Sequence, residues 1–109
     1  MAESLGIVRG TLDILVLKAL SWGPKHGYGI ARWIEETSGD DLPIEEGSLY
    51  PALHRMEEAG WVKARWATTD KGRRARMYEI TAAGRRQLES EEARWRSVTA
   101  AVGHVLKHA

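Results

Sequence analysis

The sequence contains no cysteine, which excludes disulfides, thiolate metal sites and a cysteine nucleophile. It also lacks a long hydrophobic run. The longest strongly apolar stretch, residues 14–17, is followed by Lys18 and falls far short of the roughly 20 residues of a transmembrane helix. Glu3 and Arg9 near the start leave no signal-peptide pattern. These absences favour a cytoplasmic protein that has no membrane partner.

Catalytic patterns are equally scarce. A chain of 109 residues with 43% apolar side chains builds one modest core, too small for a two-layer enzyme with a deep cleft. No nucleophile–base pair, glycine-rich phosphate loop or paired carboxylates stand out, so we expect no enzyme, no catalytic residue and no cofactor. His104 and His108 have helical i, i+4 spacing, but without a nearby carboxylate or cysteine they predict no metal site.

The formal net charge of +1 conceals an uneven distribution of charge. Residues 1–60 carry 5 basic and 10 acidic side chains, whereas residues 61–109 carry 11 basic and 5 acidic ones. The two parts therefore have net charges of −5 and +6. A positive surface on one part of the fold favours a phosphate polyanion as the partner.

Apolar residues at helical spacing predict three helices, over residues 11–22, 27–38 and 45–59. The first is apolar on two sides and ends at Gly23 and Pro24. The third has a core stripe of Leu, Leu and Met and ends at Gly60, a C′ glycine. Pro51 inside the third segment is the weakest feature of this prediction, since proline lacks the amide donor that a helix needs.

The second half of the chain predicts a hairpin and a long helix. Residues 61–67 alternate in polarity, Tyr78 and Ile80 repeat the pattern, and residues 68–74 form a basic loop between them. Thr81 is a good N-cap for a helix that runs nearly to residue 109. About 25 helical residues extend roughly 38 Å, more than a core of this size requires, so we expect a partner helix.

This order of elements is that of a winged helix-turn-helix, and the residues resemble a named family. GSLYPALHRMEEAGWV at residues 47–62 is similar to the recognition-helix signature of PadR-type transcriptional regulators. GTLD at residues 10–13 and HGYGI at 26–30 are similar to that family's first two helices, and GRR at 72–74, Tyr78, Thr81 and Gly84 to its wing and last helix. The resemblance spans residues 5 to about 90.

The resemblance implies a mainly α (α+β) fold. Residues 1–80 would form a winged helix-turn-helix DNA-binding domain, and residues 81–109 the single dimerisation helix of the family's short subgroup. It also implies a homodimeric regulator of transcription, most often a repressor, that binds an inverted repeat in double-stranded DNA. A small ligand, such as a phenolic acid or an apolar aromatic compound, would release it.

Three sets of site residues follow from this resemblance. The expected DNA contacts come from the second helix, the third helix and the hairpin: Lys25, Tyr28, Ser48, Tyr50, Pro51, His54, Arg55, Lys71, Arg73, Arg74 and Arg76. The expected dimer interface consists of apolar residues, most of them in the last helix: Leu12, Leu88, Trp95, Val98, Val102 and Val105. Trp95 is also the expected ligand-binding residue, because flat ligands stack on aromatic rings.

Several of these residues have an alternative structural role. Tyr50 can be a partly buried core aromatic, Arg55 can pair with Glu58 or Glu35, and Trp95 can be an interface anchor alone. The basic hairpin loop can be an ordinary solvated turn. The remaining tryptophans are expected to be core or half-buried residues: Trp22, Trp33, Trp61 and Trp66.

The sequence departs from the family at Glu45 and Glu46, where a small residue and proline are common. Negative charge beside phosphates lowers DNA affinity. An alternative function is therefore a winged-helix module for protein interaction or ligand sensing that has no specific DNA binding.

Overall fold

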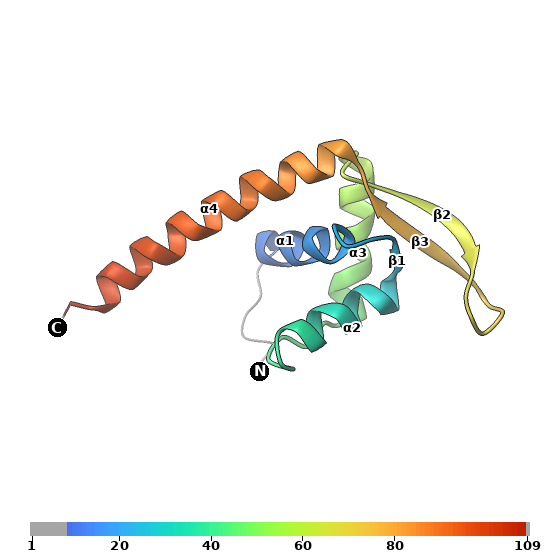
Figure 1. Cartoon of the computed structure of the whole chain (residues 1–109), viewed down its shortest axis with the longest axis horizontal. Coiled ribbons are helices and arrows are strands. Elements are labelled where there is room, and N and C mark those ends of the chain that lie inside the picture. The colour runs from blue at the N-terminus through green and yellow to red at the C-terminus, as the bar shows by residue number, and fades with distance from the viewer. Residues whose placement is uncertain (1–8, 109) are drawn as a thin grey trace.

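The computed structural model describes residues 9–108, which form four helices and a three-stranded antiparallel sheet. The elements in chain order are α1 (Arg9–Leu20), β1 (Lys25–His26), α2 (Gly27–Thr37), α3 (Glu46–Glu58), β2 (Val62–Thr68), β3 (Arg74–Ile80) and α4 (Ala82–Leu106). The sheet order is β1-β3-β2. The β2–β3 hairpin and α4 project in opposite directions from a body of three helices (Figure 1). The predicted α+β fold and its element order are confirmed.

The core lies between the three short helices, the base of the hairpin and the start of α4. α1 is its centre, as its two apolar sides predict: it packs against α2, α3, α4 and β3. The fully buried large side chains of the core are Val16, Leu17, Leu20, Ile30, Ile34, Leu49, Leu53 and Met56.

The predicted end of α3 is confirmed in detail. Gly60 has a φ of +82°, which favours glycine. The amide of Trp61 donates to the carbonyl of Met56 at 3.0 Å, and the amide of Gly60 donates to that of Glu57 at 3.1 Å, the hydrogen bonds of a Schellman cap. Pro51 lies inside α3; it removes only the bond that its own amide would donate to the Gly47 carbonyl, and the helix continues to Glu58.

The hairpin is one residue displaced from the sequence-based prediction. Val62 pairs with Ile80 at its base and Thr68 with Arg74 near its tip. The connecting loop, residues 69–73, closes with a 2.7 Å bond from the Thr69 amide to the Arg73 carbonyl, and Gly72 adopts a φ of +78°. The sheet has a third strand, β1, which the sequence analysis missed because two residues carry no periodicity.

α4 begins at the predicted N-cap. Thr81 Oγ1 accepts a 3.0 Å hydrogen bond from the Gly84 amide and donates one of 2.6 Å to the Gly60 carbonyl. A side chain at Gly84 would overlap the Trp61 carbonyl oxygen, so this start of the helix lies directly on the turn between α3 and β2. Farther along, Lys18 of α1 pairs with Glu92 at 3.3 Å. After this contact α4 runs away from the body (Figure 1).

Two residues predicted for the dimer interface lie elsewhere. Leu12 and Leu88 are each 6% exposed within the core of a single chain, so they have almost no surface to offer a partner. Leu88, Trp95 and Val102 are spaced seven residues apart, which predicts that all three face a partner helix, but the first turns of α4 cover α1 instead.

Two tryptophans are also more exposed than predicted. Trp22 follows α1 in a turn and is 73% exposed, and Trp66 lies on the hairpin and is 57% exposed. Trp33 and Trp61 are partly buried against the core, as expected. The alternation of β2 correctly assigned Trp66 to the face of Val62 and Ala64, but at that point the hairpin has left the core.

Within residues 9–108, no helix is long and apolar enough to cross a membrane. The same part of the chain contains no group of three side chains suited to hold a metal ion.

Candidate nucleic-acid interface

α3 turns one face to the core and the other to solvent. Leu49, Leu53 and Met56 are fully buried. The opposite side exposes Ser48, Tyr50, Pro51 and His54, four of the residues expected from the sequence to contact DNA. These four side chains come together on one helix surface, where a ligand as large as DNA can reach them.

Tyr50 is exposed on α3 and also packs against α2. Its side chain is 44% exposed, yet its hydroxyl and ring lie so close to Gly27 that any side chain there would overlap them. Tyr50 thereby contacts the first turn of α2. Tyr50, Tyr28, Arg32 and Glu46 line part of a depression of about 130 Å³ between α2 and α3.

Arg55 is held by an ion pair. Its Nη2 donates to Asp13 Oδ1 of α1 over 2.6 Å, with the two side chains 33% and 15% exposed. The alternative that Arg55 is an ion-pair partner is therefore realised, with Asp13 in place of Glu58 or Glu35. Arg55 joins α3 to α1 and presents only part of its guanidinium to the α3 surface.

The remaining charges on the exposed side of α3 are mostly acidic. His54 Nε2 lies 3.3 Å from Glu58 Oε2, so the imidazole faces a carboxylate of its own helix. Glu45 and Glu46 are exposed at the start of the helix. Arg55 is the single lysine or arginine in α3, which leaves positive charge for DNA to other elements.

The start of α2 carries two predicted contacts, Lys25 and Tyr28. His26 caps the helix, because its Nδ1 accepts a 3.0 Å hydrogen bond from the Gly29 amide; the sequence did not predict this cap. Tyr28 is 60% exposed, and its hydroxyl accepts a 3.0 Å hydrogen bond from Arg32 Nη1.

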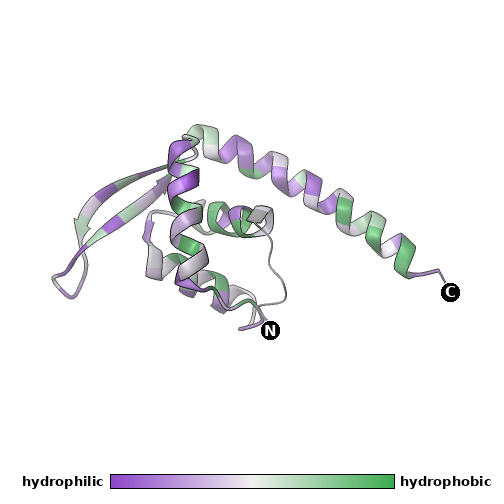
Figure 2. Cartoon of the chain, turned by 180° about the vertical axis from the view of Figure 1, so that it is seen from behind, coloured by the Kyte–Doolittle hydropathy of each residue, from purple (hydrophilic) through white to green (hydrophobic). Residues whose placement is uncertain are grey.

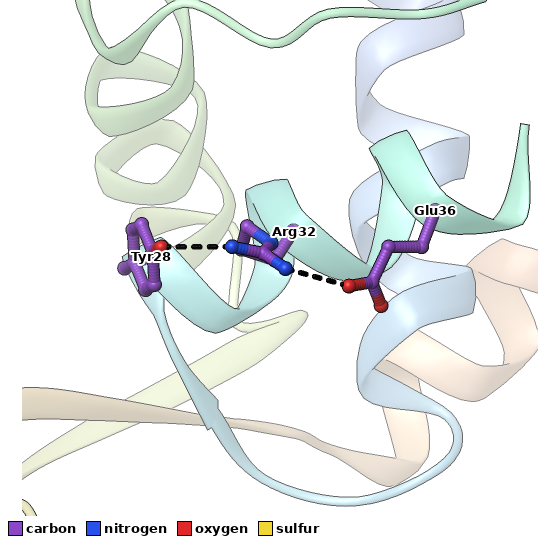
Figure 3. A network of polar contacts seen from close by, with 3 residues as sticks. All are labelled: Tyr28, Arg32 and Glu36. Carbon is purple, nitrogen blue, oxygen red and sulfur yellow. Dashed lines mark hydrogen bonds and ion pairs between the residues drawn. The ribbon is translucent and has the colours of Figure 1, made fainter. Parts of the chain in front are cut away.

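Arg32 in turn donates to Glu36 over 2.8 Å, so three exposed side chains of α2 form one network (Figure 3). The hydrogen bonds to Glu36 and Tyr28 raise the pKa of Arg32 above its ordinary value. The network fixes the position of the Tyr28 hydroxyl on the surface.

The hairpin supplies exposed cations. Lys71 and Arg73 lie in the tip loop and Arg74 opens β3, all three exposed as predicted. Arg76 is different, since its Nη2 donates to Glu57 of α3 over 2.9 Å. Lys63 and Arg65 are also exposed on β2, but they alternate to the opposite face of the strand from Trp66, and we do not include them in the candidate interface.

α4 carries an apolar stripe beyond its contact with the body. Trp95, Val98 and Val102 are 49%, 47% and 49% exposed, and Val105 is 70% exposed. Figure 2 shows hydrophobic residues gathered on the outer part of α4. Four of the six predicted interface residues thus share one uncovered helix face, which we call the α4 stripe.

Three packed helices, a hairpin that follows the third helix and projects from the body, and a long last helix define the winged helix-turn-helix fold. The family model described as "Transcriptional regulator PadR-like family" matches residues 16–90. The chain belongs to this family, and it is a PadR-like transcriptional regulator of the DNA-binding winged-helix class.

Solved structures agree with this assignment. A PadR family transcriptional regulator from Eggerthella lenta is 32% identical with a TM-score of 0.79, over 93% of this chain and 86% of that one. A transcriptional regulator from Clostridium thermocellum is 27% identical with a TM-score of 0.83, over 91% and 96% of the two chains.

Among curated proteins, a transcriptional regulator from Mycobacterium tuberculosis is 37% identical over 60 residues, 54% of this chain and 55% of that protein. A transposon protein from Streptomyces fradiae is 46% identical over 79 residues, 72% of this chain but 21% of its own length. The chain thus spans about half of the first protein and a fifth of the second.

Proposed function

We propose that this PadR-like regulator is a repressor that binds an inverted-repeat operator as a homodimer and is released by a small aromatic or phenolic ligand. The α4 stripe is the observation that carries the proposal. It is about half exposed in the single chain, and its residues recur at the spacing of a two-stranded seam. A second copy of α4 is the partner that this spacing fits, because two identical stripes can pair about a two-fold axis.

In this dimer, the exposed side of α3 enters the major groove of each half-site, and the hairpin reaches the phosphate backbone. Ser48, Tyr50 and the start of α2 donate to phosphates. Lys71, Arg73 and Arg74 provide the positive charge that α3 lacks. Pro51, His54 and Arg55 lie nearest the bases, although Asp13 restrains Arg55.

The ligand would act through α4. Two α4 helices set the distance between the two copies of α3, and a dimer reads half-sites about one helical turn, roughly 34 Å, apart. A flat compound stacked on Trp95 would change that distance and favour a dimer that fits one half-site only. Replacing Trp95 with Ala should therefore abolish both ligand affinity and release from DNA; if both persist, Trp95 does not bind the ligand.

The test is fluorescence-anisotropy binding to the DNA upstream of the protein's own coding region, at two salt concentrations, with an unrelated duplex as control. Sedimentation of the same samples gives the oligomeric state. A salt-sensitive preference for the upstream duplex, shown by a dimer, supports the proposal. A monomer at the concentrations that saturate DNA would contradict it.

The alternative function is a winged-helix module for protein interaction or ligand sensing without specific DNA binding. The acidic side chains around α3 favour it, since Glu45, Glu46 and Glu58 are all exposed there. Equal and weak binding to both duplexes would select this alternative. The search would then move to protein partners.

A further inference from the structure

The hairpin has two chemically different faces. Side chains of a strand alternate between faces, and directly paired residues share a face. One face, here called the inner face, begins with the buried Val62, Ile80 and Tyr78. It continues toward the tip with the pair Trp66 and Arg76, followed by Arg74. The core face of the sheet therefore extends beyond the core as an aromatic and cationic surface.

On this inner face the Trp66 ring contacts two guanidinium groups. The Arg74 Cζ lies 5.3 Å from a ring centroid of Trp66, and the Arg76 Cζ lies 5.7 Å from one. Both distances are within the range of a cation–π interaction. Trp66 remains 57% exposed, so its ring holds the cations without being covered by them.

The two arginines differ in what else they contact. Arg76 pairs with Glu57 of α3 at 2.9 Å, and its Nε is buried without a hydrogen-bond partner. Its charge is already balanced, and the pair links the hairpin to α3. Arg74 is exposed, and within the described residues no carboxylate pairs with it. Arg74 is thus the inner-face cation that is free to bind a phosphate.

We propose that Trp66 is a positioning residue for DNA binding, which holds the Arg74 guanidinium in place to contact a backbone phosphate. The Glu57–Arg76 ion pair fixes this unit relative to α3, so that α3 and the hairpin engage one duplex together. This inference deepens the proposed DNA interface and rests on it. A preorganised arginine binds more tightly than a free one because less side-chain entropy is lost on binding.

The outer face offers a matched control. Arg65 lies on β2 next to Trp66 and is exposed, but it alternates to the opposite face and pairs across with Met77. Trp22 is a second control, as an exposed tryptophan outside the hairpin. The variants to compare are Trp66→Ala, Trp66→Phe, Arg74→Ala, the Trp66→Ala/Arg74→Ala double variant, Arg65→Ala and Trp22→Ala.

Each full-length variant is titrated by anisotropy, over a range of NaCl concentrations, against a duplex that the wild-type protein enriches from a random-sequence pool. Trp66→Ala should weaken binding about two- to fivefold, the size of an exposed cation–π contact, and leave the salt slope unchanged. Arg74→Ala should lower that slope by about two, one phosphate contact for each subunit of the dimer. The double variant should bind as Arg74→Ala does, and Trp66→Phe should recover most of the affinity.

A second pair of residues tests the link to α3. The Glu57→Gln/Arg76→Gln double variant removes the ion pair that fixes the hairpin relative to α3, so it should weaken binding. Because the variant keeps the net charge, the salt slope should not change. Arg65→Ala and Trp22→Ala should match the wild type. Thermal unfolding of every variant separates a loss of binding from a loss of folding.

The outcomes separate the two proposals. If Trp66→Ala weakens binding by the same factor with and without Arg74, or has no effect, Trp66 does not act through Arg74 and the inference is wrong. The same holds if Arg65→Ala lowers the salt slope as much as Arg74→Ala does. If the wild-type protein enriches no duplex at all, the proposed DNA interface itself fails and this inference with it.

Discussion

Arg55 of α3 and Asp13 of α1, 42 residues apart in the chain, are joined by a 2.6 Å ion pair between Nη2 and Oδ1. The pair lies where the exposed side of α3 meets α1. α1 also holds α4, through the Lys18–Glu92 contact of 3.3 Å. One helix therefore connects the candidate DNA-reading helix to the candidate dimerisation helix.

Replacing Arg55 with Ala should lower the free energy of unfolding by about 1–2 kcal/mol, less than for a fully buried pair because a third of Arg55 is exposed. Asp13→Ala should cost a similar amount, and the double variant should cost less than the sum of the two. Urea denaturation measures all three. The Arg94–Glu91 pair at 3.6 Å is a control: with Arg94 70% exposed, Arg94→Ala should change stability by less than about 0.5 kcal/mol. If the changes in unfolding free energy of the two single variants simply add in the double variant, the contact between Arg55 and Asp13 contributes nothing to stability.

The tip of the hairpin should set the salt dependence of DNA binding. The Lys71→Ala/Arg73→Ala variant should lower the slope of log affinity against log salt concentration by about four, since each removed cation ends one phosphate contact in each subunit of the dimer. The variant should lose affinity by the same factor for the duplex enriched from the random pool and for an unrelated duplex, because phosphates carry no sequence information. The Arg94→Ala/Arg96→Ala variant of α4 removes the same charge. An equal change of slope in that variant would show that the effect is one of net charge and not of contact.

The α4 stripe should determine self-association. Val102→Glu places a charge in the middle of the stripe and should dissociate the dimer, because burial of an unpaired carboxylate is unfavourable. Ala100→Glu introduces the same side chain at an exposed position on the opposite side of the helix and should leave the dimer intact. Sedimentation over a range of protein concentrations distinguishes them. A Val102→Glu protein that sediments as the wild type does would place the interface on another surface.

Tyr78 should make the fold sensitive to alkaline pH. It is 7% exposed, and burial raises its pKa because it disfavours the phenolate. The folded chain keeps this proton to a higher pH than the unfolded chain, in which the pKa is about 10. The corresponding stability is fully present below about pH 10 and declines as the pH rises through the raised value.

Tyr78→Phe removes the titrating hydroxyl, so its stability should fall less than that of the wild type between about pH 8 and pH 11. Urea denaturation of both proteins at the two pH values gives the comparison. Parallel losses would show that other groups cause the alkaline destabilisation.

Much of the fold could be predicted because the relevant interactions are local in the chain. At the end of α3 the Gly60 amide donates to Glu57 and the Trp61 amide to Met56, and Thr81 caps α4 through Gly84. Both depend on residues fewer than six positions apart. The exposed side of α3 likewise follows from a helical period that Pro51 does not interrupt.

The errors involve residues whose surroundings come from distant parts of the chain. Leu88 fits the heptad of α4 but is buried, because the first turns of α4 lie over α1. Trp66 fits the alternation of a core strand but is exposed, because β2 continues past the helices. The hydrophobic period of one helix or strand does not indicate where a neighbouring element ends.

The sequence by itself determined the four helices and the hairpin, the end of α3 at Gly60 and the start of α4 at Thr81, the family and the division between an acidic and a basic part. Backbone conformation and side-chain period are set by neighbours in the chain. Only the tertiary structure decided which charges remain free, since Asp13 and Arg55, or Glu57 and Arg76, become partners when separate elements pack together. Within residues 9–108 it left Arg74 without such a partner on the inner face of the hairpin, beside an exposed tryptophan, because the hairpin extends beyond the carboxylates of the body.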